Sequence, residues 1–497
     1  MKKEIDGLRT KDTWEVVEEP DTINIVSCKW VLQFKHDAQG SLVDRKSRLV
    51  AQGFTQAFGV DYFETFSPVA RLDTLRIIAL LVVRNDWPLH QMDVRSAYLN
   101  APLPEPIYMR QPPNFPQGPP GTVLKLRKSL YGLKQSGREW HKCLSNAFFK
   151  FGFHCCASDP AVFHKHENGN HTIVAACVDD LTMTSNTMDG LTAIKQHLNS
   201  QFKMKDLGDL HWLLNIEITQ DRQQRTISFA QGAYIDTIIA RFNLQDAAAI
   251  SIPMDPHATL SKSQCPVNPQ QIEDMKNVPY HEAVGSLMWA AVATRPDIAF
   301  AVLFLSQFMV NPGRPHWEAV KCVLKYLKGM KDRKLTFGEE RSGIEGYTDT
   351  DWGLQEHRHS ISGYAFLIDG GAISWSSKKQ SIIALSSTEA EYIAAAHIAK
   401  EALWIRSLLS EIARPLSLPI TIYSDNQSAI ALTKEAQHHA RTKHIDLRFH
   451  FICEAVDSAA LAVQYCPTEH MVADLLTKAL PRAKVNYFAS RLGICST

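Results

Sequence analysis

One short stretch, Thr172 to Met183, limits the folds open to this chain more than any other. It holds two apolar β-like runs that meet at Val178-Asp179-Asp180. Runs of this composition on either side of a polar break predict a β-hairpin, here with two carboxylates at its tip. Because aspartate favours turns, a solvated turn is the alternative interpretation of these residues taken alone.

A third carboxylate can converge on the same tip. Asp93 lies at the end of the β-like run Gln91-Met92-Asp93-Val94. Clustered carboxylates at a sheet edge suit Mg²⁺, and nucleotidyl transfer uses two such cations roughly 3.5 to 4 Å apart. Without metal, the three negative charges would repel one another strongly. The pattern is compatible with a metal site formed by Asp93, Asp179 and Asp180, with the solvated turn as its alternative.

Composition restricts the class of protein. The 497 residues, 45% of them hydrophobic, can bury several cores, and Lys plus Arg (53) nearly equals Asp plus Glu (52). This balance excludes a polybasic tail and an acidic disordered protein, so any nucleic-acid channel must be locally basic. The ten cysteines lack zinc-like spacing, which favours reduced thiols. No apolar run of about 18 residues occurs, so we expect an intracellular protein without a membrane partner.

The remaining pattern predicts a mixture of strands and helices. Alternation over Cys28 to Lys35 predicts a strand, and the prolines between Pro102 and Pro120 predict a loop or extended crossing. Elsewhere we expect helices at 75–83, 129–151, 233–242, 280–330, 387–409 and 470–479, strands at 210–219, 225–229, 361–376 and 420–424, and a linker at 246–279. Such an order indicates compact mixed sheets.

Several longer motifs carry a resemblance to a known family. They are KSRLVAQGFTQAFGVDYFETFSPVARLDTLR (46–76), HQMDVRSAYLN (90–100), IYMRQPP (107–113), SLYGLKQSGREW (129–140), QGAYIDTIIARFNL (231–244), AVGSLMWAAVATRPDIAFAV (283–302) and HWEAVKCVLKYLKG (316–329). In order and spacing this set resembles the reverse transcriptase of copia-type (Ty1/copia) retrotransposon Pol polyproteins. The resemblance covers nearly the whole chain, and chance agreement across so many ordered segments is negligible.

The resemblance implies an α/β (α+β) fold, with a right-hand polymerase followed by an RNase H-like mixed-sheet domain. We expect reverse transcriptase fingers and palm at 1–245, a thumb- or connection-like helical region with its linker at 246–340, an RNase H-like domain at 341–485 and a C-terminal tail at 486–497.

The resemblance also assigns roles around the first carboxylates. Asp93, Asp179 and Asp180 become the polymerase metal ligands, and Tyr98 the aromatic that rejects a ribose 2′-hydroxyl. The alternative interpretation of Tyr98 is an aromatic residue of the core. Three further residues are expected at the nucleotide: Lys46 and Arg48 on the triphosphate and Gln135 lining the pocket. Their alternatives are a solvated strand face for the two cations and an ordinary helix-start residue for Gln135.

A second group of acids lies on a strand, a helix, a strand and a predicted helix, at Asp349, Glu391, Asp425 and Asp474. This order resembles the RNase H fold, in which such acids hold two metals that activate water. Glu389 is the competing acid on the helix, and we assign it to a capping box with Ser386. Asp351 competes with Asp349.

Primer and template contacts are expected at two positions where the chain departs from the family, Cys177 in place of Tyr and Asn215 in place of Gly, and in the basic loop Arg441, Lys443 and His444. That loop is an equal candidate for a solvated loop. The basic helical region 316–334 is a further candidate for tracking a strand, with a solvated face as its alternative.

Together these features predict an RNA-directed DNA polymerase with ribonuclease H activity that uses two Mg²⁺ per site, with Mn²⁺ as a substitute. Its expected partners are an RNA template, a DNA primer, RNA:DNA hybrid, deoxynucleoside triphosphates, and the retrotransposon's capsid and integrase, in a cytoplasmic virus-like particle or the nucleus. A domesticated relic that binds nucleic acid without catalysis is the alternative, but all seven acids are present. A stand-alone RNase H would leave the first 340 residues unexplained.

Overall fold

A computed structural model of the chain describes residues 1–36, 42–338, 343–352, 358–413, 416, 418–434 and 446–496. The chain divides into two compact units. The first comprises Met1–Arg71 and Pro88–Leu210, and the second Leu72–Trp87 and His211–Thr497. The mixed α/β fold is confirmed, whereas the finer boundaries at residues 245, 340 and 485 stay predictions.

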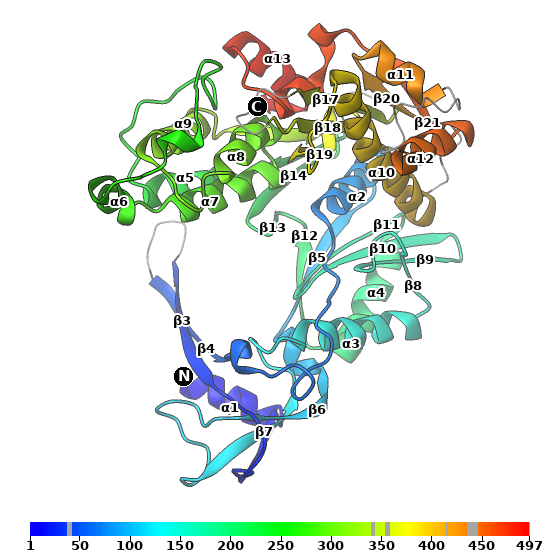
Figure 1. Cartoon of the computed structure of the whole chain (residues 1–497). Helices are drawn as coiled ribbons and strands as arrows, with labels where there is room; N and C mark the ends of the chain where they lie inside the picture. The colour runs from blue at the N-terminus through cyan, green and yellow to red at the C-terminus, as the bar shows by residue number, and fades with distance from the viewer. Residues whose placement is uncertain are drawn as a thin grey trace. The chain divides into compact units, whose positions relative to one another are not determined.

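The first unit is built around a six-stranded sheet of order β12-β5-β11-β10-β9-β8 (Figure 1). Its elements are β5 (Leu89–Val94), α3 (Ser136–Lys150), β8 (His154–Cys155), β9 (Val162–Glu167), β10 (Asn170–Cys177), β11 (Asp180–Ser185), α4 (Met188–Gln201) and β12 (Met204–Asp209). The expected hairpin is confirmed, with β10 antiparallel to β11 and Cys177 opposite Asp180.

Two helices cover this sheet with apolar faces. Helix α4 begins where the Thr187 side chain accepts a hydrogen bond from the Gly190 amide, a standard N-cap. Its Leu191, Ile194 and Leu198 follow helical spacing and are buried in one cluster with α3 and the strands. The core therefore fixes the sheet edge that carries the carboxylates.

A smaller sheet of order β1-β7-β6-β2 completes the first unit, with β3 and β4 as a separate two-stranded hairpin. The elements are α1 (Lys2–Thr10), β1 (Trp14–Glu18), β2 (Ile25–Val26), β3 (Cys28–His36), β4 (Leu42–Ala51), η1 (Gly53–Thr55), η2 (Ala97–Asn100), β6 (Pro102–Met109) and β7 (Thr122–Lys128). The expectation of a loop or crossing was wrong for β6, which pairs on both sides. Its register with β7 shifts between Pro102 and Ile107. This irregularity accommodates the prolines of β6, because a proline has no amide hydrogen to donate to the neighbouring strand.

The second unit begins with helix α2 (Leu72–Asn85) and a sheet of order β13-β14-β15-β16-β22. The other elements here are β13 (Trp212–Leu213), β14 (Ile216–Asp221), β15 (Thr226–Ala230), α5 (Gly232–Arg241), η3 (Lys262–Gln264), α6 (Pro269–Lys276), α7 (Tyr280–Ala293), η4 (Pro296–Ile298), α8 (Ala299–Ser306), α9 (Arg314–Gly329) and β16 (Arg333–Phe337). Residues 486–496, within the segment expected as a C-terminal tail, complete α13 (Arg482–Arg491) and form β22 (Ile494–Ser496), which pairs with β16.

The same unit contains a five-stranded sheet of order β19-β18-β17-β20-β21, against which α10 packs (Figure 1). Its elements are β17 (Glu345–Asp351), β18 (Ile361–Ile368), β19 (Gly371–Lys379), α10 (Ser387–Ile412), β20 (Ile420–Ser424), α11 (Gln427–Lys434), α12 (Asp446–Asp457), β21 (Leu461–Tyr465), η6 (Thr468–His470) and η7 (Val472–Leu476). Gly346 of β17 lets the strand lie close to Phe366 of β18 and Ile398 of α10. A Cβ at this position would lie only 2.7 Å from the Phe366 ring and 3.0 Å from Ile398.

One predicted helix is wrong in type. Residues 470–479 form short 3₁₀ turns rather than an α-helix. Pro481 follows closely and lacks the amide hydrogen that a longer helix needs, so the segment stays too short for α-helical turns. It still places Asp474 inside the unit, 1% exposed.

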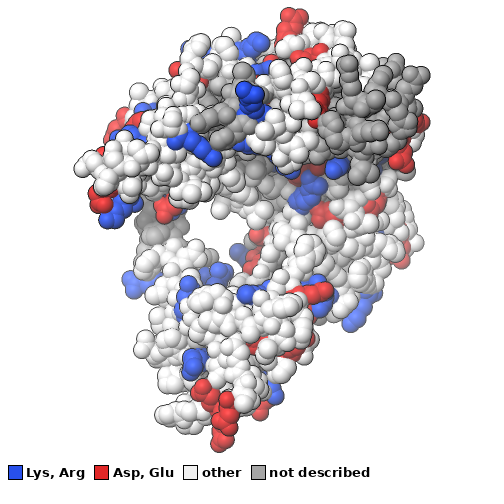
Figure 2. Space-filling view, viewed as in Figure 1, with Lys and Arg blue, Asp and Glu red and all other residues white. Residues whose placement is uncertain are grey.

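Basic and acidic side chains are interspersed over the face shown in Figure 2, as the formal net charge of +1 leads one to expect. Among the described residues, no helix combines the length and apolar character that crossing a membrane requires.

Candidate active sites

The first group of acids meets across two paired strands. Asp93 of β5 lies directly opposite Asp180 of β11, and the Val94 amide donates to the Asp179 carbonyl at 2.8 Å. Directly opposed residues of an antiparallel pair point to the same face of the sheet. All three acids are part-exposed, so the structure brings them together at an accessible edge.

The hairpin tip holds a strained backbone. Val178 has φ +60°, a left-handed conformation that β-branched residues rarely adopt. Its carbonyl accepts a hydrogen bond from Trp140 Nε1 of α3 at 2.9 Å. Since such strain persists only where the surroundings impose it, the packed helix α3 holds the Asp179-Asp180 tip in place.

Asp179 is tied to a tyrosine that sequence reasoning missed. The Tyr131 hydroxyl donates to Asp179 Oδ2 at 2.9 Å. The ring of Tyr131 lies 4.7 Å from the Tyr98 ring and 5.1 Å from the Arg48 guanidinium carbon. Tyr131 therefore joins a metal-ligand candidate to two of the expected nucleotide contacts. It lies within the SLYGLKQSG motif, but nothing in the motif itself indicates its partners.

The electrostatics of this edge favour a bound cation. Burial raises the pKa of Asp179 and of Asp180, and the charge of Asp93 raises both further. Asp179 Oδ1 is buried without a hydrogen-bond partner. Hard carboxylate oxygens, one of them unpartnered, fit a divalent ion.

Lys46 and Arg48 lie two residues apart on β4, so they share one face of the hairpin. Both cations lower the pKa of Asp179 against the effect of burial, which places them on the acidic edge rather than on a remote solvated face. Gln135 differs: it is 3% exposed, accepts from Gln56 Nε2 at 3.0 Å and donates to the Asp61 carbonyl at 2.8 Å. This arrangement favours the alternative of a structural helix-start residue.

The two family departures have local explanations. Cys177 is 5% exposed, and burial raises the pKa of its thiol to about 12, so it offers little surface to a primer. Asn215 belongs to the second unit, in the turn between β13 and β14, with φ +64°. Glycine adopts this conformation freely and asparagine tolerates it, so the turn survives the substitution.

The second group of acids is drawn together more tightly. Among the described residues, Asp349, Glu391 and Asp425 alone offer three ligand atoms within 4.8 Å of one another. Asp349 ends up on β17, Glu391 in the first turns of α10 and Asp425 just after β20. Glu391 Oε2 is buried without a hydrogen-bond partner. The donor set and this orphaned oxygen fit a divalent ion.

Asp474 is linked to the second group of acids through Lys478. Lys478 Nζ lies 2.8 Å from Asp474 Oδ1 and 3.5 Å from Asp349 Oδ2, and the Thr477 hydroxyl donates to Asp349 Oδ2. Burial and the charge of Asp349 raise the pKa of Asp474 to about 6. Burial, then Asp349 and Asp425, raises the pKa of Glu391 to about 9. Uncompensated negative charge therefore dominates this centre.

The choices between neighbouring acids agree with the geometry. The Glu389 amide donates to Ser386 Oγ at 3.1 Å, which is one half of the expected capping box, and Glu389 Oε2 accepts from the Leu385 amide at 2.7 Å, one residue before the N-cap. Asp349, and not Asp351, belongs to the converging group.

The basic helical region 316–334 is largely engaged within the protein. Lys321 pairs with Glu318, Lys331 with Asp236, and Lys328 donates to two backbone carbonyls. His316 is buried. These contacts engage Lys321, Lys328 and Lys331 within the protein, and a role of the region at a strand stays a prediction. Arg441, Lys443 and His444 lie outside the described residues, together with His438 and His439.

These observations define a mixed α/β chain with two groups of carboxylates, one at the β10–β11 hairpin tip and one beside α10. A family model described as reverse transcriptase (RNA-dependent DNA polymerase) matches residues 11–256. The Retrovirus-related Pol polyprotein from transposon TNT 1-94 of Nicotiana tabacum is 41% identical over 100% of this chain and 38% of its own length. Putative transposon Ty5-1 protein YCL074W of Saccharomyces cerevisiae is 31% identical over 62% of this chain and its whole length. The chain thus belongs to the reverse transcriptase family of copia-type Pol polyproteins.

The chain spans about a third of the length of the plant relatives, 38% for tobacco and 33% for the Arabidopsis thaliana transposon RE1 polyprotein. Among solved structures, the foamy viral protease-reverse transcriptase in complex with RNA/DNA hybrid has a TM-score of 0.49 at 12% identity, covering 93% of this chain and 52% of that one.

Proposed function

We propose that the chain copies an RNA template into DNA at the first centre and hydrolyses the RNA strand of RNA:DNA hybrids at the second. The observation that carries the polymerase proposal is the pairing of Asp93 with Asp180, beside an Asp179 linked through Tyr131 to Arg48. Family membership supports the same activity.

At the first centre, Asp93, Asp179 and Asp180 would hold Mg²⁺, or Mn²⁺ in its place. Two such ions supply activation of the primer 3′-hydroxyl and neutralise charge on the triphosphate. Arg48 offers a planar fork and Lys46 a point charge to the triphosphate oxygens. Tyr98, lying against Tyr131, forms the floor beneath the sugar and leaves no room for a 2′-hydroxyl.

At the second centre, Asp349, Glu391 and Asp425 would hold a divalent ion, with Asp474 completing the set. Bound ions supply an activated water for phosphodiester hydrolysis. Glu391 would have to lose a proton to hold the ion, because burial and the neighbouring carboxylates Asp349 and Asp425 raise its pKa to about 9. Lys478 offsets part of the charge of Asp349 and Asp474 and holds both carboxylates in position.

The substrates follow from these roles: an RNA template, a DNA primer, deoxynucleoside triphosphates and the hybrid product. Recognition of the duplex would rest on sugar and phosphate, and base pairing would carry the sequence. Capsid and integrase of the same element, in a virus-like particle or the nucleus, are the proposed assembly partners.

Primer extension on poly(rA)/oligo(dT) with Mg²⁺ tests the first centre. We expect Asp179→Asn to lose at least about a hundredfold in rate, since a metal ligand supplies several kcal/mol to the transition state. Asp189→Asn, at an exposed acid of α4, is the matched control and should extend normally. If neither the wild type nor Asp179→Asn extends the primer, the result would favour the alternative of a domesticated relic that binds nucleic acid without catalysis.

Cleavage of the RNA strand in a labelled hybrid tests the second centre. Asp425→Asn should abolish cleavage, while Asp457→Asn, at an exposed acid ending α12, should leave it unchanged. Wild-type cleavage that persists in Asp425→Asn would remove the proposal for this centre.

A further inference from the structure

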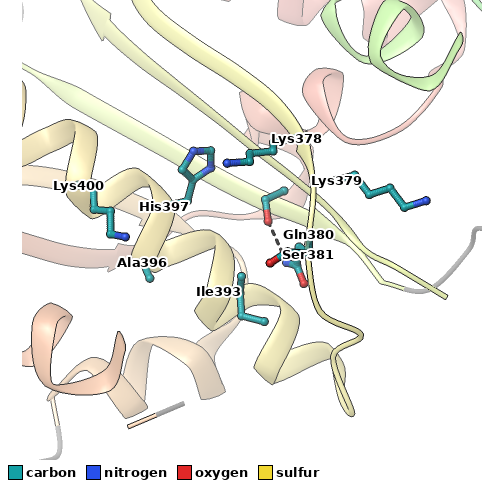
Figure 3. Close-up of a pocket in the computed structure, with 9 residues that line it drawn as sticks. Lys378, Lys379, Gln380, Ser381, Ile393, Ala396, His397 and Lys400 are labelled. Atoms are coloured by element: carbon teal, nitrogen blue, oxygen red, sulfur yellow. Dashed lines mark hydrogen bonds between the residues drawn. The ribbon is translucent and has the colours of Figure 1, made fainter. Parts of the chain in front are cut away.

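A pocket of about 130 Å³ lies in the second unit, and none of the carboxylates just described lines it. It is bounded by the end of β19, the start of β18 and the middle of α10 (Figure 3). A cavity that holds one water molecule needs only ~10–15 Å³, so this pocket has room for a polyatomic ligand. Its lining includes three lysines and a histidine beside the apolar Ile393 and Ala396, and no carboxylate.

Two of these lysines stand out because they are not neutralised. Lys378 and Lys400 are exposed, and neither makes an ion pair with any other described residue. Lys321, Lys331 and Lys478 of the same unit all have anionic partners. Two adjacent unpaired ammonium groups at one pocket attract an anion.

His397 also lines the pocket, and the charges of Lys378 and Lys400 both act on its ring. In Figure 3 the Lys378 side chain points toward the His397 ring, and Lys400 lies one turn further along α10. Burial, then the charges of Lys378 and Lys400, lowers the pKa of His397 to about 4. The imidazole is therefore neutral and keeps one N–H to donate, while the positive charge remains on the lysines.

The floor of the pocket is held rigid. Gln380 Nε2 donates to Ser362 Oγ at 2.9 Å and to the Ala390 carbonyl at 2.9 Å. Lys379 points the other way in Figure 3 and donates to Gln307 Oε1 at 2.9 Å. Because Ala390 precedes Glu391, the Gln380 amide connects the pocket floor to the helix turn that carries a catalytic candidate.

We propose that this pocket is an anion site that takes a phosphate group, with Lys378 and Lys400 as its cations and His397 as a neutral donor. Phosphate offers several acceptor oxygens and the negative charge that two ammonium groups prefer. The phosphate can belong to a nucleic-acid strand or be free inorganic phosphate, and both present the same chemistry to the pocket. Neither carboxylate centre takes part.

Lysine acetylation footprinting of the full chain, read by mass spectrometry in EDTA, tests the site without any catalysis. Its failure is therefore separate from failure of the proposed polymerase and nuclease activities. One arm contains inorganic phosphate and the other a single-stranded oligodeoxynucleotide. We expect acetylation of Lys378 and Lys400 to fall at least about threefold, with exposed Lys276 of α6 unchanged as the internal control. Protection in both arms identifies a general phosphate site, and protection by the oligonucleotide alone identifies a strand site.

Substitution provides the second measurement. Lys378→Gln/Lys400→Gln should weaken binding of the protecting probe by about tenfold, or 1.4 kcal/mol, whereas the charge-matched Lys150→Gln/Lys276→Gln should not. Unchanged acetylation of Lys378 and Lys400 in both arms, or equal weakening by the two double variants, would overturn the proposal.

Discussion

At the scale of single residues, the first centre depends on one hydrogen bond that no motif indicated. Tyr131 donates to Asp179 and supports Tyr98 and Arg48 with its ring. Burial raises the pKa of Asp179, and the Tyr131 hydrogen bond opposes this rise. The Tyr131 hydroxyl thus favours the ionised form of the carboxylate, which is the form that would hold a cation.

Tyr131→Phe removes that bond and leaves the ring. The pKa of Asp179 then rises, a smaller fraction is ionised at any acidic pH, and the acid limb of the extension pH profile moves to higher pH. We expect a rate roughly tenfold below wild type on that limb, as for loss of one hydrogen bond to a charged group. Hybrid cleavage should not change. An unmoved acid limb would contradict the role of Tyr131.

Glu391 gives the second centre a pH-dependent stability. Its folded pKa of about 9 lies above the ordinary value of 4.5, so the folded state binds more protons between these values. Stability from this group therefore falls as pH rises through that window. In EDTA, the wild-type Tm should drop from pH 5 to pH 9 relative to Glu391→Gln, and Mg²⁺ should remove the difference. Parallel melting curves for the two proteins would argue against it.

At the scale of elements, a buried ion pair stabilises the helical region of the second unit. Arg295, 1% exposed, donates to both oxygens of Asp297 at 2.9 and 2.7 Å, and the Tyr326 hydroxyl of α9 donates to Asp297 at 2.7 Å. Arg295 also donates to the Met330 carbonyl at 3.0 Å. The group joins η4 to the end of α9, so its loss leaves a buried charge unpaired.

Asp297→Asn should lower the free energy of unfolding by about 3–5 kcal/mol, the usual effect of removing one partner from a buried pair. Asp236→Asn breaks the exposed pair with Lys331 and should change it by less than about 1 kcal/mol. Urea unfolding of both variants measures the difference. Equal, small effects would mean that water reaches the Arg295 site.

Elements were predictable where a local pattern decides them. Two apolar β-like runs around a polar break identified the β10–β11 hairpin, and helical spacing with a capping serine identified α10. Strand β6 was missed because its prolines are tolerated only through a shift in register with β7. The 3₁₀ turns around Asp474 were missed because helical spacing alone does not separate a short α-helix from 3₁₀ turns.

At the scale of the whole molecule, the sequence predicted both groups of acids but not their different degree of assembly. In the second centre, three ligand atoms lie within 4.8 Å of one another. Among the described residues, the acids of the first centre do not come together as closely. Partners such as Tyr131 with Asp179, or Lys478 with Asp349, are 48 and 129 positions apart, and a single sequence carries no local pattern for such contacts. The hydrogen bonds of Gln135 were unpredictable for the same reason, since its partners Gln56 and Asp61 lie far upstream.

The account rests on divalent ions shared by Asp93 and the Asp179-Asp180 tip, and Mn²⁺ titration followed by electron paramagnetic resonance tests this directly. In Asp349→Asn/Asp425→Asn, which removes the second centre, saturable Mn²⁺ binding should remain. Adding Asp93→Asn and Asp180→Asn should abolish it, while the fold, followed by circular dichroism, stays intact. Mn²⁺ binding that is undiminished by the two added substitutions would contradict the account.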